Sequence, residues 1–239
     1  MAMTPRQYQY LGGVVPCPGG WVVVSGRLAG VTMVVEEAMV LPNLLEVLDH
    51  RPKFDAGAIY APIGLADQPC SRFRPCDEEA RQLLGWPRSV GIRPVPSRAA
   101  LNAPSLAAAR ELEPWLTNDD LRRFPRYREV EDLFQPFHQR MWVSAHPDLS
   151  FYMLNGDRPL KSSPFHGEGI VERIELIRAK VPGIEDLLNA SPPEGAGQIH
   201  IVQAAALLWT ARRGAGRAIN RLPMDPTWDS NGLRTELVR

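Results

Sequence analysis

Three histidines are placed where a metal site could form. His146 ends a short apolar run and precedes a proline, His166 follows it along the chain, and His200 lies in an apolar segment. Imidazole nitrogens suit zinc or manganese, and a histidine can also act as a general base near neutral pH. The structural alternative is that His146 caps a loop or bonds a backbone carbonyl and that His200 is simply packed. We favour that alternative.

A cysteine could supply a nucleophile. Cys76 stands next to Asp77 where a helix is expected to begin, and a cysteine there can have a depressed pKa. An approach by His146 would complete a cysteine-histidine pair. No spacing signature supports this pair, so we interpret Cys76 as a buried structural thiol. With Cys17 and Cys70 it makes an odd set without the close spacing of zinc ligands, and reduced thiols are the simplest reading.

Arginines gather in two stretches of the chain. The first stretch contains Arg72, Arg74, Arg81, Arg88, Arg93 and Arg98, and the second contains Arg122, Arg123, Arg126 and Arg128 with Phe124 and Tyr127 between them. Guanidinium groups bind phosphate or carboxylate in a bidentate way, and aromatic rings stack on bases. The alternative is a solvated, ion-paired surface. The 27 Lys and Arg balance the 27 Asp and Glu, so no overall field attracts nucleic acid or membrane.

The bulk composition is that of an ordinary globular protein. The chain has 239 residues, of which 44% are apolar and 23% charged. This length predicts a single domain over residues 1–239 with a sizeable core. No segment resembles a cleavable leader, and no apolar run approaches the ~20 residues needed to cross a membrane. We expect a cytoplasmic protein with no membrane association.

The elements that must position these side chains are predicted from apolar periodicity. Three β-rich runs, a short helix and a buried strand open the chain, at 10–17, 21–25, 31–35, 44–48 and 55–62. A helical insertion is expected at about 66–140, with helices over 77–84, 105–112 and 127–139, the first capped by Asp77. A strand follows at 141–145, and three helical segments follow at 148–154, 168–180 and 198–213. The tail at 229–238 is expected to be an edge strand or a docked extension. The last helix is rich in alanine, which lets it lie close to a sheet.

Short motifs spread over most of the chain resemble a known family. They include Gly13-Val14 with Cys17-Pro-Gly-Gly-Trp21, Pro62-Ile-Gly-Leu65, Cys76-Asp77, Pro94-Val-Pro-Ser-Arg98, His146-Pro147, Leu154-Asn155-Gly156, Trp209-Thr-Ala-Arg212 and Gly232-Leu-Arg234. Their joint order resembles domain of unknown function 429, whose members are described as predicted ribonuclease-H-like nucleases. The resemblance implies an α/β ribonuclease-H-like mixed sheet, in which a three-strand antiparallel meander and parallel strands are flanked by helices. The predicted strand order agrees with that fold.

The resemblance also implies acidic residues that this chain lacks. Such a nuclease holds two divalent cations roughly 4 Å apart with carboxylates from the first strand, the fourth strand and a late helix. The matching positions here are occupied by Val15, Tyr60, Ser144, His200 and Gln203. None of these residues supplies a charged oxygen. We therefore predict that the chain does not hydrolyse nucleic acid and needs no metal cofactor.

The remaining polar residues near these positions form a candidate pocket. They are Cys17, Asp77, Arg81, Arg98, His146 and Asp148. The leading hypothesis is a non-catalytic module that binds a partner protein, a nucleic acid or an anionic ligand, through a pocket that is neutral or basic. The alternative is a phosphoesterase that binds Mg²⁺ or Mn²⁺ through relocated acids such as Asp67, Asp77, Asp148 or Glu168. A third reading is a structural subunit whose exposed tryptophans, such as Trp86, Trp115, Trp142 and Trp228, pair with a second copy or another chain.

Overall fold

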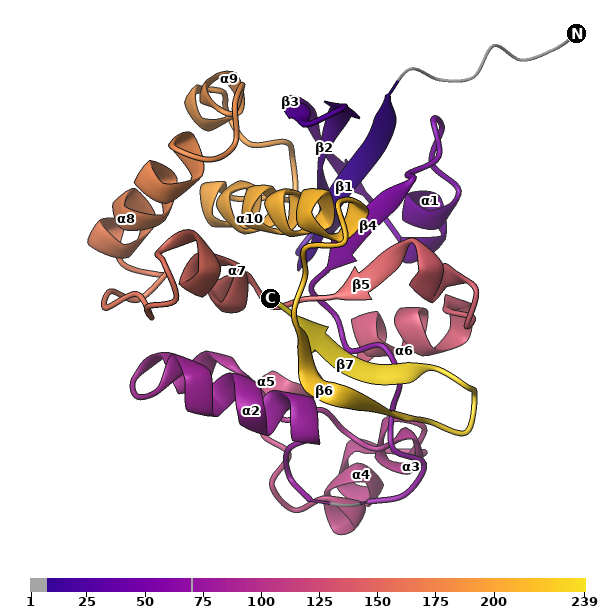
Figure 1. Cartoon of the computed structure of the whole chain (residues 1–239). Helices are drawn as coiled ribbons and strands as arrows, with labels where there is room; N and C mark the ends of the chain where they lie inside the picture. The colour runs from indigo at the N-terminus through magenta and orange to yellow at the C-terminus, as the bar shows by residue number, and fades with distance from the viewer. Residues whose placement is uncertain (1–7, 70) are drawn as a thin grey trace, which may run out of the picture.

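A five-stranded mixed sheet forms the centre of the molecule (Figure 1). The structure is a computed structural model that describes residues 8–69 and 71–239, so Cys70 lies outside the described residues. The strands are β1 (Gln9–Cys17), β2 (Gly20–Ala29), β3 (Thr32–Leu41), β4 (Ala56–Ile59) and β5 (Trp142–Ser144), in the order β3-β2-β1-β4-β5. β1, β2 and β3 are antiparallel neighbours, whereas β4 runs parallel to β1 and β5 parallel to β4. This arrangement confirms the predicted meander with parallel strands, an α/β fold consistent with the ribonuclease-H-like class.

The first face of the sheet is covered by α10 (Gln198–Ala215), and α7 (Pro147–Leu154), α8 (Gly167–Arg178) and α9 (Glu185–Asn189) pack around that helix (Figure 1). The three consecutive alanines that begin at Ala204 are all buried. A Cβ atom built on Gly13 of β1 would lie 2.0 Å from the Ala204 carbonyl oxygen. The glycine and the alanine run therefore permit the close contact between helix and sheet that the sequence predicts.

The opposite face carries a second core. It packs against α1 (Leu44–Leu48) and α6 (Phe124–Leu133), with Trp21, Phe54 and Trp142 at its centre. Asn43 caps α1, because its side chain accepts a hydrogen bond from the Glu46 backbone at 3.0 Å. Burial on both faces explains why β1 and β2 consist almost entirely of apolar residues.

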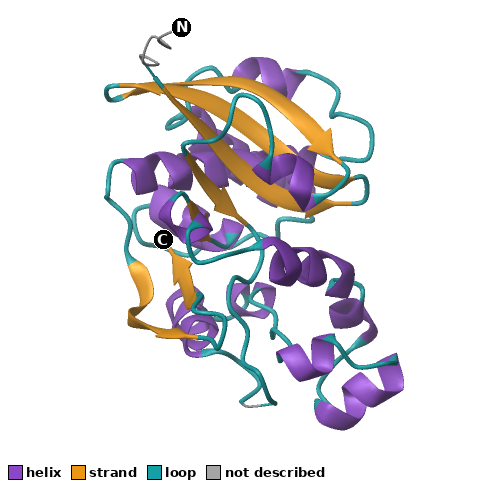
Figure 2. Ribbon diagram, turned by 90° about the vertical axis from the view of Figure 1, so that its right-hand side faces the viewer, coloured by secondary structure: helices purple, strands orange, loops and turns teal. Residues whose placement is uncertain are grey.

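A lower layer lies beyond the edge of the sheet where β5 ends (Figures 1 and 2). It contains α2 (Pro75–Leu84), η1 (Arg88–Gly91), α3 (Arg98–Leu101), α4 (Leu106–Leu112), α5 (Asn118–Leu121) and the hairpin of β6 (Arg221–Trp228) with β7 (Arg234–Val238), whereas η2 (His138–Arg140) lies next to the start of β5. A parallel bridge between Ala145 and Val238 joins this hairpin to the end of β5. The layer has two small apolar clusters of its own.

Several element boundaries differ from the prediction. α2 begins at Pro75 with Arg74 at its N-cap position, so Asp77 lies inside the first turn and does not cap the helix; its carboxylate pairs with Arg74 instead. The third insertion helix starts earlier than predicted and ends at Leu133. Only α6 of the insertion packs on a sheet face, since the other insertion helices build the lower layer. Within the described residues, no helix combines the length and apolar character that crossing a bilayer requires.

Candidate functional site

A cavity of about 540 Å³ opens at the edge of the sheet where β1, β4 and β5 end. Its lining comes from segments far apart in the sequence: the β1–β2 turn, the residues after β4 and β5, the start of α10, α2, the 92–95 loop and the start of α6. Cys17, Tyr60, His146 and His200 all face this one space. The carboxyl ends of the strands and the late helix thus converge at one edge of the sheet.

The positions where the resemblance implies carboxylates fall into two groups. Tyr60 and His200 line the cavity. Val15 is fully buried in the core beneath α10, and the Ser144 hydroxyl donates a hydrogen bond to the Ala61 carbonyl at 2.6 Å. Gln203 is half-buried on α10 and is not part of the lining.

The candidate pocket residues also divide. Cys17, Asp77 and His146 line the cavity, and the other three do not. Asp148 accepts a hydrogen bond from the fully buried Arg173 at 3.0 Å. Arg81 donates to the Ser89 and Ile92 carbonyls at 2.7 and 3.2 Å, which ties α2 to the segment after it.

Asp77 is the one carboxylate in the described lining, and it is already paired. Both of its oxygens accept hydrogen bonds from Arg74, at 2.7 and 3.0 Å, and Arg74 also donates to the Gly64 carbonyl. Burial alone would lower the pKa of the Arg74 guanidinium, but the adjacent Asp77 carboxylate more than reverses this, so the pKa lies above its ordinary value. Asp77 therefore has little capacity to hold a cation.

His146 is engaged through both ring nitrogens. Nδ1 accepts from the Asp148 backbone N–H at 3.1 Å, so Nε2 carries the proton and donates to the Gly91 carbonyl at 3.2 Å. Burial holds the pKa of His146 below its usual value. The ring contacts Tyr60 edge-on, with centroids 4.7 Å apart. His146 thus caps α7 and anchors a loop, as the structural interpretation predicts.

His200 also has a local role, and the two described cysteines, Cys17 and Cys76, have raised pKa values. His200 Nδ1 accepts from the Gly197 backbone N–H at 2.9 Å at the start of α10. Cys76 is fully buried, and burial raises its pKa to about 12, which opposes a role as a thiolate nucleophile. Burial likewise raises the pKa of Cys17. Among residues 8–69 and 71–239, no group of three His, Cys, Asp or Glu side chains could hold a metal ion.

Arginines dominate the charge of the cavity. Arg74, Arg93, Arg122, Arg123 and Arg126 face it, against Asp77 alone. Arg93 is held by Asp120 through Nε and Nη2, at 3.1 and 2.8 Å, and Arg126 donates from Nη1 to Glu129. In the described part of the chain, Arg123 bonds only through Nη1, to the Asp119 carbonyl and more weakly to the Asp120 carboxylate. Several guanidinium donors therefore remain for a ligand.

Two tyrosines complete the polar lining. Tyr60 and Tyr127 are half-buried and face the cavity, and neither hydroxyl has a hydrogen-bond partner in the described chain. Burial raises the pKa of both hydroxyls, so both stay protonated. Tyr60 is identified in the sequence only as a lost acid, and its place in the cavity lining comes from the geometry. The apolar lining, which includes Ile92 and Leu237, has no motif that would reveal it.

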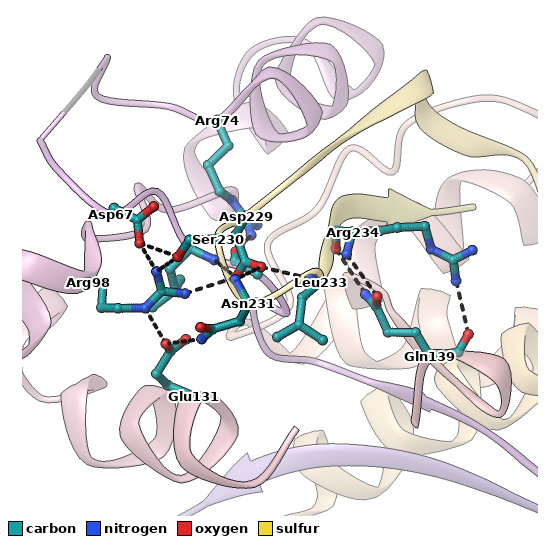
Figure 3. Close-up of polar contacts among 12 residues, drawn as sticks. Asp67, Arg74, Arg98, Glu131, Gln139, Asp229, Ser230, Asn231, Leu233 and Arg234 are labelled. Carbon is teal, nitrogen blue, oxygen red and sulfur yellow. Dashed lines mark hydrogen bonds and ion pairs between the residues drawn. The ribbon is translucent and has the colours of Figure 1, made fainter. Parts of the chain in front are cut away.

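Arg98 lies in a separate ion cluster under the β6–β7 turn (Figure 3). It donates to three carboxylates, Asp67, Glu131 and Asp229, and to the Ser230 hydroxyl. Asp229 also accepts from the Leu65 and Leu233 backbones at 3.2 and 2.8 Å. This cluster fastens the hairpin to the insertion and lies outside the cavity lining.

Comparison with known proteins identifies the family. A search of curated proteins and a search of solved structures each found no match. A family model described as a protein of unknown function, DUF429, matches residues 13–227. Since this match spans most of the chain, the protein belongs to the DUF429 family.

Proposed function

We propose that this protein is a non-catalytic ribonuclease-H-like module that binds a small anionic ligand in the cavity at the edge of its sheet. The observation that carries the proposal is the charge of the lining, which has five arginines and one carboxylate. A site that binds cations would need the opposite balance. An arginine-rich pocket with apolar walls suits an organic anion.

The residues present do not fit a pair of divalent cations. Mg²⁺ and Mn²⁺ require several oxygen ligands, and both Asp77 oxygens already accept hydrogen bonds from Arg74. The other three relocated acids of the phosphoesterase alternative are not part of the lining: Asp67 pairs with Arg98, Asp148 pairs with Arg173, and Glu168 lies in the first turn of α8. No observation therefore favours that alternative.

A small ligand is favoured over a macromolecule. The cavity has the size of pockets that enclose small organic molecules, and it is walled by six or more chain segments. A nucleic acid or a partner protein would need an extended surface, such as a charged groove or a large apolar patch. Binding of a nucleic acid instead of a small anion is one of the outcomes that the test below detects.

Two measurements on the full chain test the proposal. Calorimetric titration with Mg²⁺ and Mn²⁺ is expected to show no micromolar site, and single- and double-stranded nucleic acids are expected to stay intact with either metal. Thermal shift assays with small organic phosphates and carboxylates are expected to show stabilisation. Metal-dependent cleavage, or stabilisation by oligonucleotides without any by small anions, would contradict the proposal.

A further inference from the structure

We propose that the cavity recognises a phosphomonoester, whose phosphate is bound by Arg123 and by the hydroxyl groups of Tyr60 and Tyr127. This inference rests on the proposed function and adds the chemical class of the ligand. The three residues come from the end of β4 and from the junction of α5 with α6, and all three line the same cavity.

The three side chains form one electrostatic neighbourhood. The Arg123 guanidinium lies near enough to both tyrosines to counteract part of the rise in their hydroxyl pKa values. The charge that Tyr60 would carry also contributes to the raised pKa of the Tyr127 hydroxyl. Because all three side chains line the same cavity, we expect one anionic group to reach the three donors.

The donors of these side chains are available. Within residues 8–69 and 71–239, Arg123 uses only Nη1, which leaves Nε and Nη2, the two nitrogens of a bidentate contact. Each tyrosine adds one O–H donor, and Arg93 contributes Nη1 from the adjacent loop. A phosphate has three terminal oxygens that can accept these bonds, whereas a carboxylate has two oxygens. The number of donors favours phosphate.

The neighbouring groups do not repel an anion. Asp77 is neutralised by Arg74 through two hydrogen bonds, and His146 is neutral with both nitrogens engaged. At Tyr60, where the resemblance implies a carboxylate, a phenol donates a hydrogen bond instead of accepting one. This substitution reverses the sign of the charge that the edge of the sheet can bind.

The rest of the ligand is expected to be apolar or aromatic and compact. Beyond the charged groups the cavity is walled by Pro16, Pro62, Ile92, Val95 and Leu237. These side chains offer no hydrogen bonds to a sugar polymer but suit a ring or a short apolar body. A compound of the size of a nucleoside monophosphate meets both requirements.

The test compares matched probes on the full-length protein by isothermal titration calorimetry. The probes are adenosine monophosphate and phenyl phosphate, with adenosine, benzoate and inorganic phosphate as their partial counterparts. We expect at least one phosphomonoester to bind about tenfold more tightly than its counterpart without phosphate, because hydrogen bonds to a charged group have about this effect.

Variants then locate the phosphate. Tyr60→Phe and Tyr127→Phe each remove one hydroxyl, and each is expected to weaken binding of the phosphomonoester about tenfold; Arg123→Gln is expected to weaken it more. Tyr152→Phe and the exposed Arg178→Gln lie outside the cavity lining and serve as matched controls without effect. Circular dichroism verifies that each variant is folded.

The outcomes separate the two proposals. Binding of benzoate with the same dependence on Arg123, at equal or higher affinity, overturns the phosphomonoester and leaves the anion-binding module intact. Binding of phosphomonoesters that is unchanged in all three variants overturns the site. If none of the anionic probes binds, both proposals fail.

Discussion

Two regions of this molecule, the Arg98 ion cluster and the cavity, differ in what surrounds their guanidinium groups. Arg98 contacts three carboxylates and a hydroxyl, so its donors are satisfied within the protein. The cavity contains five arginines against one carboxylate, and Arg123 retains two nitrogens without a partner in the described chain. This difference indicates that a group of arginines can form a binding surface only where nearby carboxylates leave some guanidinium N–H donors without a hydrogen-bond partner.

Arg74 provides the most severe test of this comparison, because it lines the cavity and yet donates two hydrogen bonds to Asp77. Asp77→Asn should cost about 3 kcal/mol of unfolding free energy, because it leaves a buried guanidinium without its counter-charge. Urea denaturation measures the loss. The double variant Arg74→Met/Asp77→Leu removes both charges and should lose less. Equal losses in the two variants would contradict a charge-pairing role.

The variant Arg98→Leu tests whether the ion cluster is structural. Removing the guanidinium leaves Asp229, whose side chain is 1% exposed, and Glu131 as neighbouring uncompensated carboxylates. We expect a loss of about 2 kcal/mol, below the full cost of a buried charge because Arg98 is itself partly exposed. Adding Asp229→Asn to this variant should restore part of the stability in urea unfolding, and a further loss would argue against charge imbalance as the cause.

A smaller effect is expected at His146, on the wall of the cavity. The folded state holds this ring neutral with a lowered pKa, whereas the unfolded chain takes up a proton near pH 6.5, so stability falls as the pH drops below that value. His146→Gln should reduce the stability lost between pH 7 and 5.5 by about 1 kcal/mol. Residual acid sensitivity is expected from His138 and His200, whose pKa values burial also lowers. Unfolding curves across this pH range provide the measurement.

The smallest change in stability is expected for Arg123→Gln, and this variant tests the difference between the cavity and the ion cluster most directly. Arg123→Gln should alter the unfolding free energy by less than about 0.5 kcal/mol, because Arg123 makes only partly exposed contacts. Its effect should appear in ligand binding instead. A loss as large as that of Arg98→Leu would show that Arg123 is a structural residue and that the two regions do not differ.

Much of the fold could be predicted, because β1, β2 and α10 carry long apolar runs whose pattern is unambiguous. β6 could not, because it contains two prolines and is largely exposed, features that are atypical of a strand. At the site, the positions of Tyr60 and His200 follow from the family resemblance. The pairing of Asp77 with Arg74 and the open donors of Arg123 depend on side-chain distances, which a linear pattern does not contain.

The walls of the cavity extend from Pro16 to Leu237, almost the whole length of the chain. Loops of that length must close before the walls meet, and closing them is the slow part of folding in proteins rich in distant contacts. The pocket is therefore expected to form only when the sheet, the insertion and the terminal hairpin have docked. Occupancy of the pocket would then stabilise the entire native state, and a fragment lacking any of these parts would have no site.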